Sequence, residues 1–478
     1  MVNKFYHSVR MNPELCTGCI NCIKRCPTQA IRIRNGKSVI NHKYCIDCGE
    51  CIRVCPHHAR YACYDRFEEL DRYKYTIALP DPSLYSQFNH LGDINIILNA
   101  LVRMGFDTVF EVSAAAELVS EVTREYVSQH EEELPMISTA CPSVVRLIRV
   151  KFPNLISHLL PLNSPAEVAA RMAVQHAMEK TGLSRKEIGV FFISPCPSKV
   201  TYAKAPLGTE KSEIDRVVAI KDVYPLLLSK MKEVSILLDQ DEDAVLEDYS
   251  NSGKIGISWG RSGGEAAALF TDSYLAADGI ENVIKVLEDL EDQKLSGDLR
   301  FVELNACSGG CVGGALMVEN PYAAAVKLKL LRKFKPVTGR HPYMEEAADQ
   351  VVPWDSEVIY EPVYSLGGNM MESFLRLGQV EKLLEKFPGL DCGACGAPTC
   401  KALAEDIVRG EAGEEDCVYY LRDNLAKMSE VVNTLVDKLR KGKADDQEIL
   451  QILKRYVEKI SNEVEKLDNR HSENSRKF

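Results

Sequence analysis

The chain has 478 residues, of which 45% are hydrophobic, and carries a formal charge of −11. This length and apolar content predict more than one domain, and the acidic balance argues against nucleic acid as the main partner. The first ten residues, MVNKFYHSVR, lack the apolar stretch of a secretory signal, and no run of about 20 apolar residues is present. We therefore expect a cytoplasmic protein without a membrane span.

Seventeen cysteines are far too many for an ordinary cytosolic chain. Disulfides are rare in that compartment, and these cysteines cluster at short spacings beside proline and glycine. The pattern favours metal ligation. Iron–sulfur clusters lose iron in air, so we expect a reducing or anaerobic setting.

Two cysteine runs occupy the N-terminal part of the chain. Each has the spacing Cys-x2-Cys-x2-Cys-x3-Cys-Pro, which is typical of two-cluster bacterial ferredoxins, where the fourth cysteine of each run ligates the other cluster. We predict one [4Fe–4S] cluster on Cys16, Cys19, Cys22 and Cys55, and a second on Cys45, Cys48, Cys51 and Cys26. Two structural zinc sites are the alternative, but they do not require this doubled spacing. The segment between the runs predicts a β-hairpin turning at Asn35–Gly36, and Cys63 lies outside the pattern as a free thiol.

A third group of cysteines lies near the C-terminal end. The group comprises Cys392, Cys395, Cys400 and Cys417. With its glycine-rich loop and the helical pattern KALAEDIVR, the stretch from about 379 to 420 resembles the small four-iron domain of corrinoid iron–sulfur proteins and membrane-coupled ferredoxin oxidoreductases. The resemblance implies a third accessory [4Fe–4S] cluster, and a zinc knuckle is the alternative.

Beyond Tyr420 the apolar residues follow a heptad spacing, interrupted at Gly442. The first block comprises Leu421, Leu425, Met428, Val432, Leu435 and Leu439, and the second comprises Ile449, Leu453, Tyr456, Ile460, Val464 and Leu467. The pattern fits either a helical hairpin folded on its own domain or a coiled coil that forms a homodimer or contacts a signalling partner.

From Tyr75 onward, apolar segments that resemble strands alternate with helical segments such as 92–104. The expected strands are YTIALP, PMIST, EIGVFFISP, KIGISW and RFVELNA. This alternation is typical of α/β proteins, in which ligands gather at the strand ends. Because three cysteine segments follow such strands, we expect one crevice where Cys141, Cys196, Cys307 and Cys311 converge.

The loops that hold these four cysteines resemble the three signature motifs of iron-only ([FeFe]) hydrogenases. STACPSV is similar to Thr-Ser-Cys-Cys-Pro, SPCPSK to Met-Pro-Cys-x-x-Lys, and NACSGGCVGG to Ala-Cys-Pro-Gly-Gly-Cys-x-Gly-Gly. SWGRSGGEAAAL also matches a helix start of that family. The likeness runs from about residue 75 to 375, and an N-terminal ferredoxin unit is a usual companion.

This resemblance implies an H-cluster. Its four-iron cube would be held by Cys141, Cys196, Cys307 and Cys311, and Cys311 would bridge to a di-iron unit that carries carbon monoxide, cyanide and an azadithiolate. Cyanide is negative, so a buried cation and a hydroxyl should bind it. Lys199 matches the family's cyanide-binding lysine, with a surface lysine as the alternative, and Ser83 falls where a hydroxyl donor is found.

The chain departs from the hydrogen-evolving members at Ala140. They carry a proton-transferring cysteine there, and alanine can neither ionise nor hydrogen-bond through its side chain. Leu118 stands where that family's relay places a glutamate, and two family methionines are replaced by Ser194 and Asn305. We expect the three nearby acids, Glu117, Glu121 and Glu125, to form the solvated face of a helix.

Removing a general acid–base lowers a rate by about 10²–10⁴-fold, so we predict an oxidoreductase, a ferredoxin-type [FeFe] hydrogenase of low turnover that resembles the family's sensory branch. The predicted fold is an α/β H-cluster domain (73–376) with an N-terminal α+β ferredoxin domain (1–72), a C-terminal Fe–S domain (377–420) and a helical tail (421–478). Expected partners are H2 and protons, a ferredoxin-like protein and the hydrogenase maturases. The alternative is a non-catalytic iron–sulfur protein with a plain central cube.

Overall fold

The structure is a computed structural model that describes residues 7–240, 245–295, 297–339 and 352–440, with a few single positions beyond. It divides into two compact units. The first comprises Met1–Gly368 with Gly396–Pro398, and the second comprises Asn369–Cys395 with Thr399–Phe478. Among the described helices, none combines the length and apolar content that a membrane crossing requires.

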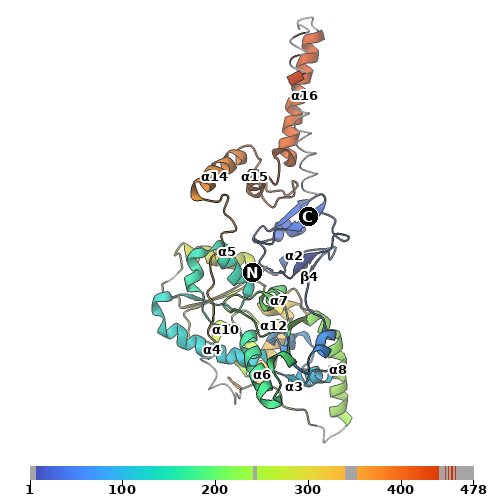
Figure 1. The fold of residues 1–478 in the computed structure, drawn as a ribbon, viewed down its shortest axis with the longest axis vertical. Coiled ribbons are helices and arrows are strands. Elements are labelled where there is room, and N and C mark those ends of the chain that lie inside the picture. The colour runs from blue at the N-terminus through green and yellow to red at the C-terminus, as the bar shows by residue number, and fades with distance from the viewer. Residues whose placement is uncertain are drawn as a thin grey trace. The chain divides into compact units, whose positions relative to one another are not determined.

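The first unit begins with two small antiparallel sheets that frame the first two cysteine runs (Figure 1). Strand β1 (Val9–Met11) pairs with β4 (Arg60–Ala62), and β2 (Ile31–Arg34) pairs with β3 (Lys37–Ile40). Helix α1 (Asn21–Arg25) precedes β2 in the chain, and helix α2 (Glu50–Arg53) precedes β4. The predicted hairpin is confirmed. Its turn residues Asn35 and Gly36 both have positive φ, the conformation that a tight two-residue hairpin needs.

A four-stranded parallel sheet forms the centre of the first unit. Its strand order is β6 (Thr108–Val109), β5 (Tyr75–Pro80), β8 (Ile188–Ser194) and β9 (Arg216–Ala219). Alternate residues of β8 face opposite sides: Phe192 packs with helices α4 (Val112–Gln129) and α6 (Pro165–Thr181), whereas Phe191 packs with α3 (Asn95–Arg103) and α8 (Ile220–Gln240). A strand buried on both faces explains the unbroken apolar run in the sequence.

A second parallel sheet has the order β10 (Tyr274–Asp278), β11 (Phe301–Asn305) and β7 (Met136–Ile137). Helices α5 (Pro142–Lys151) and α11 (Ile280–Glu291) cover one of its faces. The short helices α7 (Pro197–Lys204), α9 (Lys254–Ser258) and α10 (Gly264–Ala267) and the longer α12 (Pro321–Leu331) complete this unit. Short 3-10 segments connect these elements, among them η2 (Pro82–Gln87) and η6 (Cys311–Gly313).

Two expectations for this unit were wrong. The segment KIGISW, expected as a strand, forms helix α9 (Lys254–Ser258). Glu117, expected on a solvated face, is only 5% exposed, and its carboxylate accepts hydrogen bonds from the backbone N–H groups of Gly253, Gly256 and Gly339. A buried carboxylate that satisfies N–H groups at a helix start stabilises that helix, which apolar periodicity alone does not reveal.

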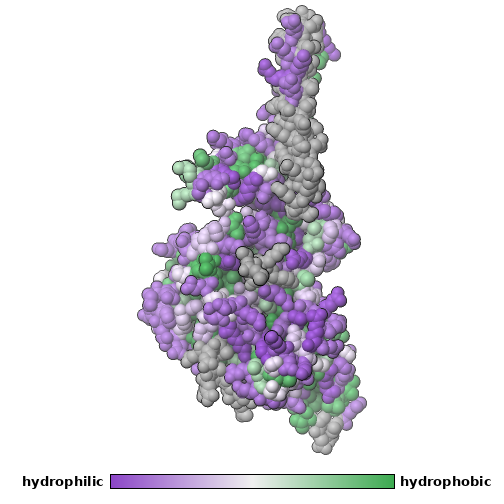
Figure 2. Space-filling view, in the orientation of Figure 1, coloured by the Kyte–Doolittle hydropathy of each residue, from purple (hydrophilic) through white to green (hydrophobic). Residues whose placement is uncertain are grey.

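The second unit contains α14 (Met370–Leu384), α15 (Cys400–Val408) and α16 (Val418–Arg440). The side chains of Asn369 and Thr399 cap α14 and α15, and the predicted helix KALAEDIVR is confirmed as α15. Helix α16 carries the first heptad block, and the second block lies outside the continuously described residues. Exposed apolar side chains gather over α14, among them Met370 and Phe374 (Figure 2).

Candidate functional site

The first group of N-terminal thiols surrounds a small cavity. Cys16, Cys19, Cys22 and Cys55 all line it, together with Arg60. Arg60 is 3% exposed, and its guanidinium nitrogens have no hydrogen-bond partner of nitrogen or oxygen among the described residues. Burial raises the pKa of Cys22, and the charge of Arg60 opposes that rise. A buried cation with free donors beside thiols fits an anionic iron–sulfur cluster, whose sulfur atoms accept such bonds.

The second group of thiols includes the buried Cys51 and the half-buried Cys45, Cys48 and Cys26. Burial raises the pKa of Cys45 and Cys48 well above the ordinary value, and of Cys51 to about 12. Nearby Cys26 raises all three pKa values further, so the structure places Cys26 beside the second run and Cys55 beside the first. That arrangement corresponds to the crossed ligation expected from the spacing.

Three of the four central cysteines follow strands of the first unit. Cys141 and Cys196 are the N-cap residues of α5 and α7, each followed by a proline at the first helical position. Cys307 follows β11, and Cys311 begins η6. Proline at the first helical position already has the backbone angle that a helix needs. Each proline therefore fixes the cysteine before it, Cys141 or Cys196, at the start of its helix.

The charges of these thiols act on one another. Burial raises the pKa of Cys141, and Cys307 raises it further. Burial also raises the pKa of Cys196 to about 12 and that of Cys311 well above its usual range, with added contributions from neighbouring thiols of this group. Four half-buried thiols close enough to interact in this way fit a metal cluster, which binds them as thiolates.

Glycines allow the ligand loops to approach closely. A Cβ on Gly310, whose φ is +88°, would lie 2.4 Å from the backbone nitrogen of Ser262. A Cβ on Gly314 would lie 2.2 Å from the carbonyl oxygen of Pro195, directly before Cys196. A larger residue at Gly310 would push the Cys311 loop away from Ser262, and one at Gly314 would push the Cys311 and Cys196 loops apart.

A cavity of about 30 Å³ lies beside Cys311. Ala140 also lines it, so the position of the absent family cysteine faces the same space as the expected bridging ligand. Its other walls include the apolar side chains Pro82, Val112, Ala116, Pro165, Ala166 and Trp259. Apolar walls combined with a set of convergent polar groups are typical of sites that hold a cofactor.

Lys199 reaches this cavity, but it is already paired. Its Nζ lies 2.6 Å from Oδ2 of Asp81, a side chain that is 1% exposed. Ser83 lies on the other side of the same carboxylate and donates from Oγ to Asp81 Oδ1 at 2.6 Å. Burial alone would lower the pKa of Lys199, but Asp81 and the nearby thiolates Cys311 and Cys196 raise it overall. Lys199 is therefore a half-buried cation, and among the described residues only Asp81 accepts a hydrogen bond from its three N–H donors.

Two buried carboxyl groups line the same cavity. Burial and the neighbouring Glu303 raise the pKa of Glu265 to about 8, against a smaller opposing effect of Ser138, whose Oγ donates to Glu265 Oε2 at 2.6 Å. The backbone N–H of Ala140 donates to that serine oxygen at 3.3 Å. Burial raises the pKa of Glu303 too, although it accepts bonds from two backbone N–H groups and from Asn305 Nδ2. The charge of Glu303 therefore favours the protonated form of Glu265.

Sequence reasoning missed Asp81, Glu265 and Glu303, although each stands inside a segment already singled out. Asp81 precedes Pro82 in LPDPS, Glu265 lies in SWGRSGGEAAAL, and Glu303 interrupts an otherwise apolar strand. A charged residue inside a buried strand is rare enough to have indicated a site. Ser194 has a local role, because its Oγ accepts from the backbone N–H of Cys196 at 3.3 Å and fixes that loop.

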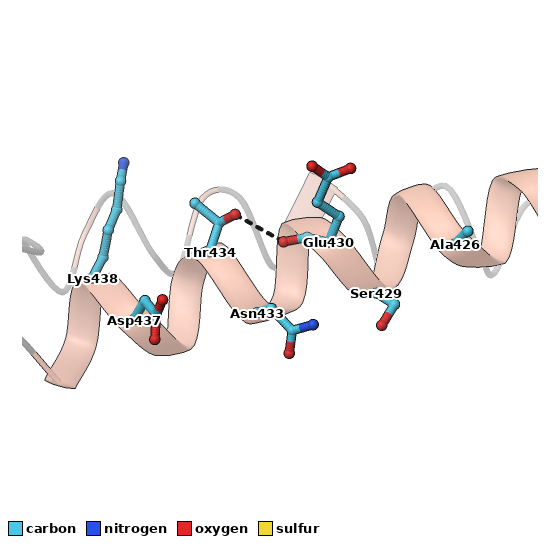
Figure 3. A pocket seen from close by; sticks show the side chains of 7 residues that line it. All are labelled: Ala426, Ser429, Glu430, Asn433, Thr434, Asp437 and Lys438. Carbon is cyan, nitrogen blue, oxygen red and sulfur yellow. Dashed lines mark hydrogen bonds between the residues drawn. The ribbon is translucent and has the colours of Figure 1, made fainter.

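The remaining cysteines lie in the second unit or outside the clusters. Cys417 is buried and Cys392 is exposed, whereas Cys395 and Cys400 are half-buried. Cys63 is exposed and lies outside these cysteine groups. A hollow along α16 is lined only by small and polar side chains among the described residues, and Thr434 Oγ1 donates there to the carbonyl of Glu430 (Figure 3). This face of α16 carries no metal-ligating cysteine or histidine.

Comparison with known proteins identifies the central part of the chain. A model of the iron-only hydrogenase large subunit, C-terminal domain, matches residues 74–276 and 271–315, half of the chain. The chain belongs to the iron-only hydrogenase family. A 4Fe-4S dicluster model matches residues 8–56, and an Fe-S cluster model matches residues 387–419. The predicted family and fold class are confirmed.

The relatives of this iron-only hydrogenase homologue are distant and include both hydrogenases and iron–sulfur assembly factors. Iron hydrogenase 1 of Clostridium pasteurianum is 25% identical over 366 residues, 63% of this chain and 62% of that protein. A cytosolic Fe-S cluster assembly factor, the NAR1 homolog of Schizosaccharomyces japonicus, is 29% identical over 99 residues, 20% of this chain and 19% of that protein. The solved [FeFe]-hydrogenase HydA1 of Chlamydomonas reinhardtii gives a TM-score of 0.46 at 16% identity, covering 63% of this chain and 97% of that one. The chain thus spans less than two thirds of the curated hydrogenase.

Proposed function

We propose that this chain binds H2 at an H-cluster (H2 = 2 H⁺ + 2 e⁻) and relays electrons through three accessory [4Fe–4S] clusters, with a turnover low enough to suit an H2 or redox sensor. The observation that carries the proposal is the cavity beside Cys311. It contains the position where the family's proton-transferring thiol is replaced by Ala140, and it places a pair of buried carboxyl groups beside that position.

The residues present fit the organometallic group that the family binds. Cys141, Cys196, Cys307 and Cys311 would hold the cube, and the di-iron unit, when bound, supplies the chemistry of H2 cleavage and formation. Beside it, Lys199 would donate to a negatively charged ligand while Asp81 keeps its ammonium in place. Ser83 supports Asp81 from the other side, so its role is to orient that carboxylate.

Protons in this cavity would be held by Glu265. With its pKa at about 8, the carboxyl is protonated at neutral pH and able both to donate and to accept near the operating pH. A proton on Glu265 has a poor route to solvent. Among the described residues, the carboxylates of Glu265 and Glu303 form hydrogen bonds only with Ser138, Asn305 and backbone N–H groups. None of these bonds connects them to an exposed acid. A buried proton donor that no chain of hydrogen bonds connects to solvent exchanges its proton slowly, and this supports a low turnover.

Two measurements test the proposal. Infrared spectra of the matured protein should show carbon monoxide and cyanide bands, and H2 uptake and evolution should both be detectable at a rate far below that of fast family members. Turnover equal to a fast member would refute the role given to Ala140. Physiological electron exchange is expected through the N-terminal clusters to a ferredoxin-like partner, after the di-iron unit has been installed by maturases.

A second function is favoured by one observation at the same site. Asp81 already neutralises Lys199, so the cavity is stable without a negatively charged ligand there. That arrangement also suits an iron–sulfur electron-transfer or assembly protein with a plain central cube, and assembly factors are among the relatives. Iron and sulfide counts that reach four cubes, without any diatomic-ligand bands after maturation, would favour this alternative.

A further inference from the structure

An arginine of the N-terminal ferredoxin part contacts a ligand of the central cluster directly. Arg53 ends helix α2, between Cys51 and Cys55. Its Nη2 donates to Cys307 Sγ at 2.9 Å and to the carbonyl oxygen of Gly313 at 2.7 Å. Helix α2 therefore reaches from the second accessory cysteine group to a cysteine of the central group through one side chain.

The contact is fixed from the ferredoxin side by a carboxylate. Arg53 Nη1 donates to Glu50 Oε2 at 2.6 Å, and Glu50 Oε1 accepts in turn from Arg25 at 3.2 Å. Glu50 stands one turn before Arg53 on the same helix, so the guanidinium is held at both ends of its fork. Such a pair of contacts gives a planar guanidinium one orientation rather than several.

The backbone around α2 is also seated tightly against the central ligand loops. A Cβ on Gly49, the N-cap of α2, would lie 2.8 Å from Ala315 Cβ and 3.0 Å from Pro197 Cγ, so this glycine packs next to the Cys196 loop. The hydroxyl of Ser8 donates to the carbonyl oxygen of Pro197 at 2.7 Å. These contacts hold the Arg53–Cys307 hydrogen bond in a rigid setting.

The charge of Arg53 acts on the cluster that Cys307 would hold. A guanidinium group is not deprotonated in proteins, so Arg53 is positive at every pH of interest. Adding an electron makes a cluster more negative. A fixed cation that donates an N–H bond to a ligand sulfur stabilises this reduced form more than the oxidised form and therefore raises the reduction potential.

We propose that Arg53 sets the reduction potential of the central cube and positions the second accessory cluster to exchange electrons with it. In the transfer, one electron leaves the reduced accessory cluster, which is oxidised by one equivalent, and the central cube is reduced by one; no bond forms or breaks. The inference rests on the central cube of the proposed function and is independent of the di-iron unit. It applies equally if the protein holds a plain cube.

The test is a redox titration of the full chain with its iron–sulfur clusters loaded and without the di-iron unit, followed by electron paramagnetic resonance. In Arg53→Gln, one of the four cubes should be about tenfold harder to reduce, a decrease in midpoint potential of about 59 mV for a one-electron couple. Arg53→Lys keeps the charge but loses the forked pair of contacts. The midpoint potential of that cube should therefore lie between its values in Arg53→Gln and in the wild type.

A matched control is Arg72→Gln. Arg72 pairs with Glu69 at 3.1 Å with the same spacing of three residues, but on the surface, so all four cubes should titrate as in the wild type. A wild-type potential for every cube in Arg53→Gln overturns the proposal; if that variant does not assemble its clusters, a wild-type potential in Arg53→Lys overturns it. A wild-type chain that assembles only three cubes overturns the proposed function as well, and iron counts distinguish that outcome.

Discussion

Glu265→Gln tests the proposed proton carrier with a minimal change of shape. The amide retains an oxygen that accepts from Ser138 but cannot ionise. Removing a general acid lowers a rate by about 10²-fold or more, so both H2 evolution and uptake should fall by at least that factor. In the wild type, evolution should decline as pH rises through about 8, where Glu265 loses its proton, and uptake should rise over the same range. The variant should lack both dependences.

The same change has a consequence for stability that can be worked out from the pKa. The folded state raises the pKa of Glu265 from an ordinary 4.5 to about 8, so the fold favours the protonated form. The stabilisation from that preference is complete below pH 4.5 and is lost as pH rises toward 8. Each pKa unit corresponds to about 1.4 kcal/mol, which gives a loss on the order of 5 kcal/mol above pH 8. Gln cannot ionise and does not incur this loss.

Thermal melting at two pH values measures this difference. The wild type and Glu265→Gln should melt at similar temperatures at pH 5, and the variant should melt several degrees higher than the wild type at pH 9. Ser138→Ala removes a bond that favours the ionised carboxyl, so it should move the pH of declining activity upward. Glu121→Gln, an exposed position, is the control. A melting difference independent of pH would refute the burial argument for Glu265.

Other changes test the rest of the site. Ala140→Cys should raise H2 turnover in both directions, measured after maturation. Asp81→Asn should leave half-buried Lys199 without its counter-ion, costing about 3–5 kcal/mol in the melting of the chain without the di-iron unit and less once that unit is installed. Gly49→Ala places a side chain at φ +77° against two neighbours and should destabilise the N-terminal cluster part by about 1–3 kcal/mol, measured by its loss of iron on heating. Truncation after Tyr420 should lower the oligomeric state in light scattering, and an unchanged state would remove support for a coiled-coil tail.

Most of the features that the sequence predicts follow from the spacing of residues within short segments. Four-residue patterns such as Cys16 to Cys19 report constraints that lie within one loop, so they can be recognised without a fold. Strand β8 was equally readable because burial on both faces leaves a long apolar run. The crossed placement of Cys26 and Cys55 also follows from spacing, since it is a property of the doubled pattern rather than of distant contacts.

Contacts between distant segments could not be predicted in the same way. Asp81 and Lys199 are 118 residues apart, and nothing in either segment indicates that they form an ion pair. Glu117 looks like one acid of three on an amphipathic helix until the fold brings the N–H groups of Gly253 and Gly256 to it. Arg53 and Cys307 are 254 residues apart, so the link between the two cluster regions is visible only in the folded chain.

The chemistry of position 140 depends on what lies beside it. A thiol there would have an ordinary pKa of about 8.5, close to the value of about 8 for Glu265, so a proton could pass between the two with little change in free energy. Ala140 removes the first of these groups and leaves the second. If Glu265 is the carrier, Ala140→Cys should raise turnover only while Glu265 is present, and the double variant Ala140→Cys/Glu265→Gln should show no gain over Glu265→Gln. Equal gains in both backgrounds would show that the thiol delivers its proton to a different group.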